Sequence, residues 1–213
     1  MTYKRNQIEE AIARLFDLNG QHPTSDLRMR IRRLLELDRA AGRKLRSKDA
    51  EEANFAFFSD EGPGSGADVS FSEYESFALL NALILMAHRW PASFAVSVMR
   101  RVRRDLEREH RRILQQDPNK LFDAKAILER ARPGALVVTN TDPVFIALAS
   151  KMPPDPDETQ AVPACAVCHG EKKVEEFVRK IGATSVTFFE VVTFAHSLNQ
   201  QLRKTAPRPR GRG

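Results

Sequence analysis

The chain has 213 residues, of which 42% are hydrophobic and 29% are charged, and its length suits one large domain or two small ones. This composition is typical of a folded globular protein and excludes a collagen-like or wholly disordered chain. Two cysteines exclude a scaffold built on disulfides. The N-terminus lacks an apolar signal region, and the longest apolar run, residues 77–87, is too short to cross a membrane. We therefore expect a cytoplasmic protein without a membrane span.

The charge balance is basic, with 34 Lys and Arg against 28 Asp and Glu, a formal net charge of +6. The basic excess is concentrated in residues 1–50, 100–135 and 182–213, whereas residues 51–99 are acidic. Such segregation is typical of a protein that binds a polyanion. The alternative is that these segments are helices whose solvated faces happen to be rich in arginine.

The first 42 residues predict two helices joined by a turn. Apolar residues recur at helical spacing over residues 6–16, with Asn6 as the expected N-cap and Glu9 at its capping-box position. A turn at residues 19–23 follows. The second helix begins at Thr24, Ser25 or Asp26 and ends at Gly42.

The next segment predicts a β-hairpin and two further helices. Residues 54–59 alternate like a strand, 61–67 are rich in glycine, and 68–72 can return as the second strand. Ser72 and Glu75 predict a capping box at the start of a helix over residues 73–89. A long amphipathic helix is expected over residues 92–116.

The remaining residues predict a small α/β part. We expect helices over 123–132 and 171–181, and a last helix that starts at 193 or 195 and runs to 203. Residues 135–140 and 144–150 are expected to form two strands or one interrupted strand, residues 184–192 another strand, and residues 152–164 a loop. The tail, 205–213, cannot fold alone. The expected fold class is α+β, mainly helical, with a winged helix-turn-helix domain at 1–116, an α/β dimerisation or regulatory domain at 117–204, and a disordered basic tail.

The order of elements over residues 6–104 resembles the DNA-binding half of MerR-type transcription regulators. Residues 26–30 match the second helix, 55–71 the glycine-rich wing, 71–74 the aromatic entry into the third helix, and 90–93 the turn before the fourth. The resemblance implies a winged helix-turn-helix that binds DNA. The chain differs from that family in its long first helix, in the acidic residues of its wing (Asp60, Glu61 and Asp68), and in continuing into an α/β segment where that family usually has a coiled coil.

Three groups of arginines are the candidate DNA contacts. Guanidinium groups suit guanine edges and phosphates, so the second helix is a candidate for the major groove, while a stripe on the long helix can follow phosphates. The tail arginines stand among prolines and glycines and are expected to meet phosphates only. For each helix the alternative is a solvated arginine-rich face. The groups are Arg28, Arg30, Arg32 and Arg33 on the second helix, Arg104, Arg108 and Arg111 on the long helix, and Arg208, Arg210 and Arg212 in the tail.

The sequence Cys165-Ala-Val-Cys168-His169 is the other motif that has a known chemistry. It matches the letters of a c-type haem attachment site, supplies up to three zinc ligands, and has the spacing of a redox dithiol. Haem attachment needs export, a zinc site needs four ligands, and a redox dithiol is expected in a βαβ context; the sequence indicates none of these. We therefore expect two loop cysteines without chemistry, and no metal or cofactor.

Motifs for catalysis are missing: there is no P-loop, no G-x-G-x-x-G, no G-x-S-x-G, and the histidines are scattered. The sequence therefore favours a non-enzyme, a transcription regulator that reads double-stranded DNA with its second helix. One helix-turn-helix reads few base pairs, so a homodimer is expected, with its contact outside residues 24–42. The alternative is a protein–protein adaptor or an accessory component of a defence or mobile-element system, whose basic faces meet an acidic protein.

Overall fold

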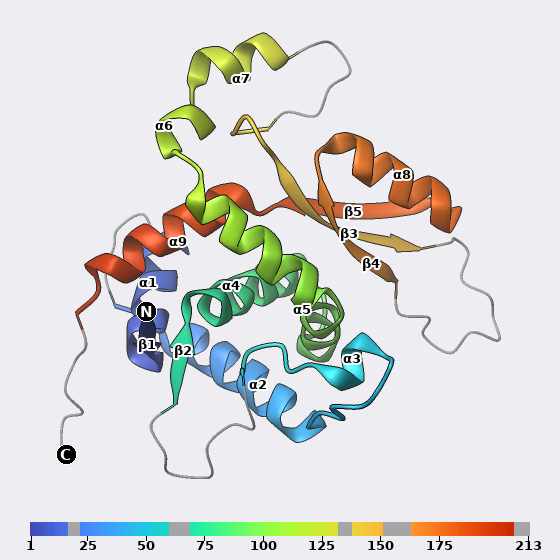
Figure 1. The fold of residues 1–213 in the computed structure, drawn as a ribbon. Coiled ribbons are helices and arrows are strands. Elements are labelled where there is room, and N and C mark those ends of the chain that lie inside the picture. Colours follow the sequence, from blue (N-terminus) through green and yellow to red (C-terminus); the bar gives the residue numbers. More distant parts are fainter. Residues whose placement is uncertain (17–21, 60–68, 132–137, 151–162, 207–213) are drawn as a thin grey trace. The chain divides into compact units, whose positions relative to one another are not determined.

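The computed structural model describes residues 1–16, 22–59, 69–131, 138–150 and 163–206 (Figure 1). It is an α+β protein in which about 61% of the described residues are helical and two small sheets are present. The chain divides into two compact units, one formed by residues 1–103 with 197–213 and the other by residues 104–196. Helices α5 (Ala92–Gln115) and α9 (Val192–Lys204) contribute to both units, whereas the sequence suggested a boundary after residue 116.

The first unit is built around helix α4 (Glu73–Ala87), which is apolar on all sides and almost entirely buried. A helix of this kind belongs in a protein core. Its predicted capping box is confirmed, because Ser72 Oγ accepts a hydrogen bond from Glu75 N and the Glu75 carboxylate accepts one from Ser72 N. The remaining elements that lie wholly within this unit are β1 (Thr2–Lys4), α1 (Arg5–Phe16), α2 (Ser25–Ala41), α3 (Ala50–Ala53) and β2 (Ser70–Ser72).

The predicted hairpin is wrong. Residues 54–59 form no strand, and β2 pairs in an antiparallel sense with β1, with Tyr3 opposite Phe71. The reason lies in Asp38, whose carboxylate accepts the backbone N–H groups of Ala56 and Phe57, both at 2.9 Å. These N–H groups are therefore not available to a strand partner. The expected turn over 61–67 and two of the acidic wing residues, Asp60 and Glu61, lie outside the described residues, as does Asp68.

The second unit contains an antiparallel sheet in the order β4-β3-β5, made of β3 (Val144–Ser150), β4 (Ala164–His169) and β5 (Ser185–Glu190). Helix α8 (Glu171–Ile181) packs on this sheet, and its Val174 joins the buried cluster of Phe145, Ala147 and Cys168. The strands β3 and β5 and helix α8 confirm the sequence predictions. Short helices α6 (Pro118–Leu121) and α7 (Ala124–Arg130) precede the sheet.

Two local predictions need correction. Helix α1 begins at Arg5, so Asn6 is inside the helix, and Lys4 N donates to Gln7 Oε1 at 2.9 Å where the Asn6 cap was expected. In the expected strand over 135–140, residues 138–140 are not in a strand and 135–137 lie outside the described residues. Most of the expected loop over 152–164 is also outside them. Among the described residues, no helix combines the length and the apolar character that crossing a bilayer requires.

Candidate nucleic-acid interface

Helix α2 has a buried side and a cationic side. Thr24 caps its first turn, because its Oγ1 accepts a hydrogen bond from Leu27 N at 3.2 Å. Ile31, Leu34, Leu35 and Asp38 are buried. The four arginines predicted as DNA contacts are all exposed, as both the DNA-binding interpretation and the solvated-face alternative expect: Arg28, Arg30, Arg32 and Arg33.

Three of these four arginines are paired with carboxylates of the protein. Arg30 Nε lies 2.8 Å from Asp26 Oδ2, and Arg32 Nε lies 2.7 Å from Glu36 Oε1. Arg28 Nε is 3.7 Å from Glu9 Oε2. Arg33 makes no ion pair with any described residue. Exposed pairs of this kind add little to stability, so a phosphate can replace the carboxylate at small cost.

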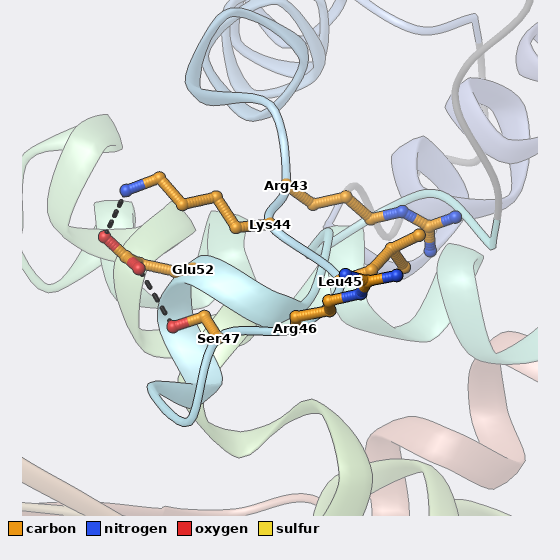
Figure 2. Close-up of a pocket in the computed structure, with 6 residues that line it drawn as sticks. All are labelled: Arg43, Lys44, Leu45, Arg46, Ser47 and Glu52. Carbon is orange, nitrogen blue, oxygen red and sulfur yellow. Dashed lines mark hydrogen bonds and ion pairs between the residues drawn. The ribbon is translucent and has the colours of Figure 1, made fainter.

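A basic loop over residues 43–48 follows α2, and the sequence analysis did not single it out. It begins after Gly42, which adopts a positive φ of 60° and ends the helix by donating its N–H to Arg39 O at 3.1 Å. The loop lines an open hollow of about 470 Å³ together with Glu52 (Figure 2). Its dense run of cations over six residues is a signal that the sequence did contain.

The shape of this loop is fixed by Glu52 of α3. Its Oε1 accepts from Lys44 Nζ at 2.8 Å and its Oε2 accepts from Ser47 Oγ at 2.9 Å (Figure 2). The backbone adds a hydrogen bond from Lys44 N to Glu52 O at 2.7 Å. The pairing with Glu52 also raises the pKa of Lys44 and, with the hydrogen bond from Ser47, lowers the pKa of Glu52. The loop is therefore held in one arrangement with both groups charged.

Arg100 of α5 supports the start of the loop from the protein interior. Its Nε donates to Asp38 Oδ1 at 2.6 Å, and its Nη2 donates to Asp38 O at 2.8 Å and to Gly42 O at 2.6 Å. Its Nη1 donates to Glu51 O at 3.2 Å. Arg100 therefore uses its donors to join α2, the loop and α3, and it has no exposed surface to offer a partner.

The predicted stripe on α5 lies in the second unit. Arg104, Arg108 and Arg111 are all exposed and are spaced so that they share one helical face. Arg108 Nη2 is 2.9 Å from Asp105 Oδ1, whereas Arg104 and Arg111 make no ion pair with the described residues. The three tail candidates, Arg208, Arg210 and Arg212, lie outside the described residues.

Asp142 forms a polar cluster in the second unit. Its Oδ1 lies 2.6 Å from His169 Nε2, and its Oδ2 accepts from Gln116 Nε2 at 2.6 Å and from Arg112 Nη1. Burial alone raises the pKa of Asp142, but the hydrogen bonds from His169, Arg112 and Gln116 outweigh it and lower that pKa to about 2. The cluster fastens α5 and the end of β4 to the turn before β3.

The two cysteines are not in a loop, contrary to the sequence prediction, because both belong to strand β4. Side chains alternate across a strand, so Cys165 and Cys168 point to opposite faces of the sheet. Cys168 is buried against Phe145 and Val174, and this burial raises the pKa of its thiol. This arrangement does not suit a dithiol or a shared pair of zinc ligands, and the described residues contain no cluster of three metal-ligating side chains.

Comparison of the chain with models of protein families, with curated proteins and with solved structures finds no match.

Proposed function

We propose that the chain is a sequence-specific DNA-binding transcription regulator whose helix α2 enters the major groove. In this proposal α1 and α2 supply the two helices of a helix-turn-helix. The observation that supports it is the division of α2, in which Ile31 and Leu34 are fully buried and the arginines Arg28, Arg30, Arg32 and Arg33 are exposed. The second helix of such a motif reads base edges with its outward side chains.

The ion pairs on α2 are compatible with this role. Glu9 also accepts a hydrogen bond from Arg5 Nε at 2.7 Å, so Arg28 can turn toward DNA without leaving that carboxylate unpaired. Arg33 needs no such exchange. The arginines of the α5 stripe and of the tail are assigned to phosphates, which position a protein on DNA but do not specify sequence.

Salt dependence is the first test of this proposal. Lys and Arg side chains release condensed counterions when they bind DNA, so raising the salt from about 50 to 200 mM is expected to weaken binding by orders of magnitude if six or more phosphates are contacted. The measurement is fluorescence anisotropy with a labelled duplex. Absent binding at low salt, or binding that ignores salt, would contradict the proposal and favour an adaptor that meets an acidic protein.

Arg28 tests whether α2 is the reading helix. Arg28→Ala is expected to remove about 1–3 kcal/mol of discrimination if this side chain makes a bidentate guanine contact. Arg28→Lys keeps the charge but loses the planar fork, so nonspecific binding and its salt slope are expected to persist while selectivity falls. Affinities for a selected and a scrambled duplex give both quantities. If both variants bind both duplexes like the wild type, the stripe of Arg104, Arg108 and Arg111 becomes the candidate.

The proposal includes a homodimer, because a twofold pair doubles the site that one motif reads. Its contact is placed outside residues 24–42, and the mass in solution with and without DNA tests it. The tail is assigned a nonspecific role, which deletion of residues 207–213 tests. Thr205 is kept in that variant because its carbonyl oxygen accepts a hydrogen bond from Gln7 Nε2 at 2.8 Å.

A further inference from the structure

We infer that the basic loop over residues 43–48 inserts Leu45 into the minor groove and bends the DNA. The inference rests on the DNA binding proposed above and adds the groove, the contacting segment and the kind of base step. The expected target is a pyrimidine–purine step such as TA or CA/TG, because these steps unstack most easily.

Hydrogen bonds to other parts of the first unit hold the loop before any partner arrives. Glu52 holds the side chains of Lys44 and Ser47, and Ser47 N donates to Lys44 O at 2.9 Å. Arg43 Nη1 donates to Ser59 O at 3.1 Å, and its guanidinium lies over the Phe55 ring. A segment held in this way loses little conformational entropy when it binds.

The loop presents one apolar side chain together with cations to solvent. Leu45 is 70% exposed, one of six exposed large apolar side chains among the described residues. Arg46 and Lys48 are also exposed and make no ion pair with any described residue. A single exposed leucine is ordinary on a protein surface. A leucine followed by two cations that make no ion pair with the described residues has the chemistry of an apolar wedge in the minor groove, where cations meet phosphates and the apolar side chain separates two base pairs.

The loop can reach the minor groove next to the major groove that α2 occupies. Helix α2 has 17 residues and is therefore about 26 Å long. The loop starts directly after its last turn. On the same side of the duplex, a minor groove follows the major groove after about half a helical turn, which is about 17 Å along the DNA axis. A helix whose first turns occupy the major groove can therefore place the following loop over the adjacent minor groove.

The test uses a duplex to which the wild type binds, with 2-aminopurine placed in turn at each TA or CA step. This base fluoresces more when it is unstacked. Wild-type protein is expected to raise the fluorescence several-fold at one step, and Leu45→Ala to abolish that rise. The wild type is also expected to prefer a duplex with a mismatch at that step by about tenfold, because unstacking there costs less, and the variant to lose this preference.

Leu128→Ala is the matched control, since Leu128 is 72% exposed on α7, outside the proposed DNA contacts, and its loss is expected to leave the fluorescence rise intact. Both variants change exposed side chains, so both are expected to fold. If the wild type binds DNA but raises the fluorescence at no step, or if Leu45→Ala raises it like the wild type, the inferred wedge is wrong while the proposed function stands. If the wild type binds no DNA, the proposed function fails and the wedge fails with it.

Discussion

Arg100 and Arg32 have the same guanidinium group and lie in the same unit, but their surroundings are opposite. The Arg100 side chain is 5% exposed and pairs with a fully buried Asp38, whereas the Arg32 side chain is 68% exposed and pairs with an exposed Glu36. The first pair organises the backbone around it, through Gly42, Glu51, Ala56 and Phe57. The second pair joins two residues of the same helix, α2.

The difference between Arg100 and Arg32 shows that the net charge of a basic protein overstates the number of cations available to a partner. The arginine-rich part of α5 includes Arg100, Arg101 and Arg103, all of which are occupied by contacts within the first unit: Arg101 pairs with Glu51 at 2.7 Å, and Arg103 Nη1 donates to Phe55 O at 2.7 Å. Arg100 and Arg103, whose side chains are 5% and 11% exposed, contribute to the net charge of the chain but not to a surface for a partner. Among the described residues, the cations that remain available include those on α2, on the loop after it and on the Arg104 stripe.

The largest expected effect comes from breaking the buried pair. Asp38→Ala leaves Arg100 charged and buried, and it also leaves the N–H groups of Ala56 and Phe57 without an acceptor, so we expect a loss of about 3–5 kcal/mol in the free energy of unfolding. Urea unfolding measures it. Arg32→Ala is the control from the exposed side and is expected to unfold like the wild type. Equal urea midpoints for Asp38→Ala and the wild type would contradict the contrast between the two pairs.

The same pair of residues explains which part of the fold the sequence did not predict. The helices were predictable because their apolar spacing and caps are local, as at Ser72 and Glu75. Residues 54–59 alternate like a strand, yet their N–H groups bind the carboxylate of Asp38, a partner 18 residues away in sequence. Strand β4 was missed because it follows a proline-rich segment. Neither the Asp38 contact nor the pairing of β4 with β3 has a local signature.

The candidate site was predictable only in part. The buried and exposed sides of α2 follow from helical periodicity, so the positions of Ile31 and of the four arginines could be predicted. The partners of those arginines could not, because Glu9 belongs to another helix. The loop of residues 43–48 was visible as a cluster of charge, but its fixed shape depends on Glu52 and Arg100, whose roles appear only in the folded chain.

In the second unit, a buried histidine provides a further test of how burial acts on a titratable group. His110 is 4% exposed, and burial together with the nearby His196 lowers its pKa to about 4. The unfolded chain therefore binds the proton more readily, so stability is lost as the pH falls from about 6.5 to about 4, by about 3 kcal/mol in total. Urea unfolding at a series of pH values measures it.

His110→Gln is the matched variant for this test, because it removes the titrating group and keeps a polar side chain. Subtracting its pH profile from that of the wild type isolates the contribution of His110 from those of other groups. The difference is expected to grow below pH 6.5 and to level off below pH 4. Parallel profiles would show that His110 is not held neutral in the folded protein.

The smallest expected effect concerns the exposed Arg32–Glu36 pair of α2. It tests whether a DNA phosphate can replace the carboxylate of Glu36. Glu36→Gln removes the carboxylate that holds Arg32, and both side chains are exposed, so the variant is expected to unfold like the wild type. If Arg32 faces DNA, removal of this negative charge is expected to raise affinity at low salt by about two- to fivefold. Glu176→Gln is the control, because Glu176 forms a similar exposed pair with Lys173 on α8 and is expected to leave affinity unchanged. An affinity that stays the same or falls in Glu36→Gln would mean that this side of α2 does not face the DNA, and the reading surface would then have to exclude Arg32.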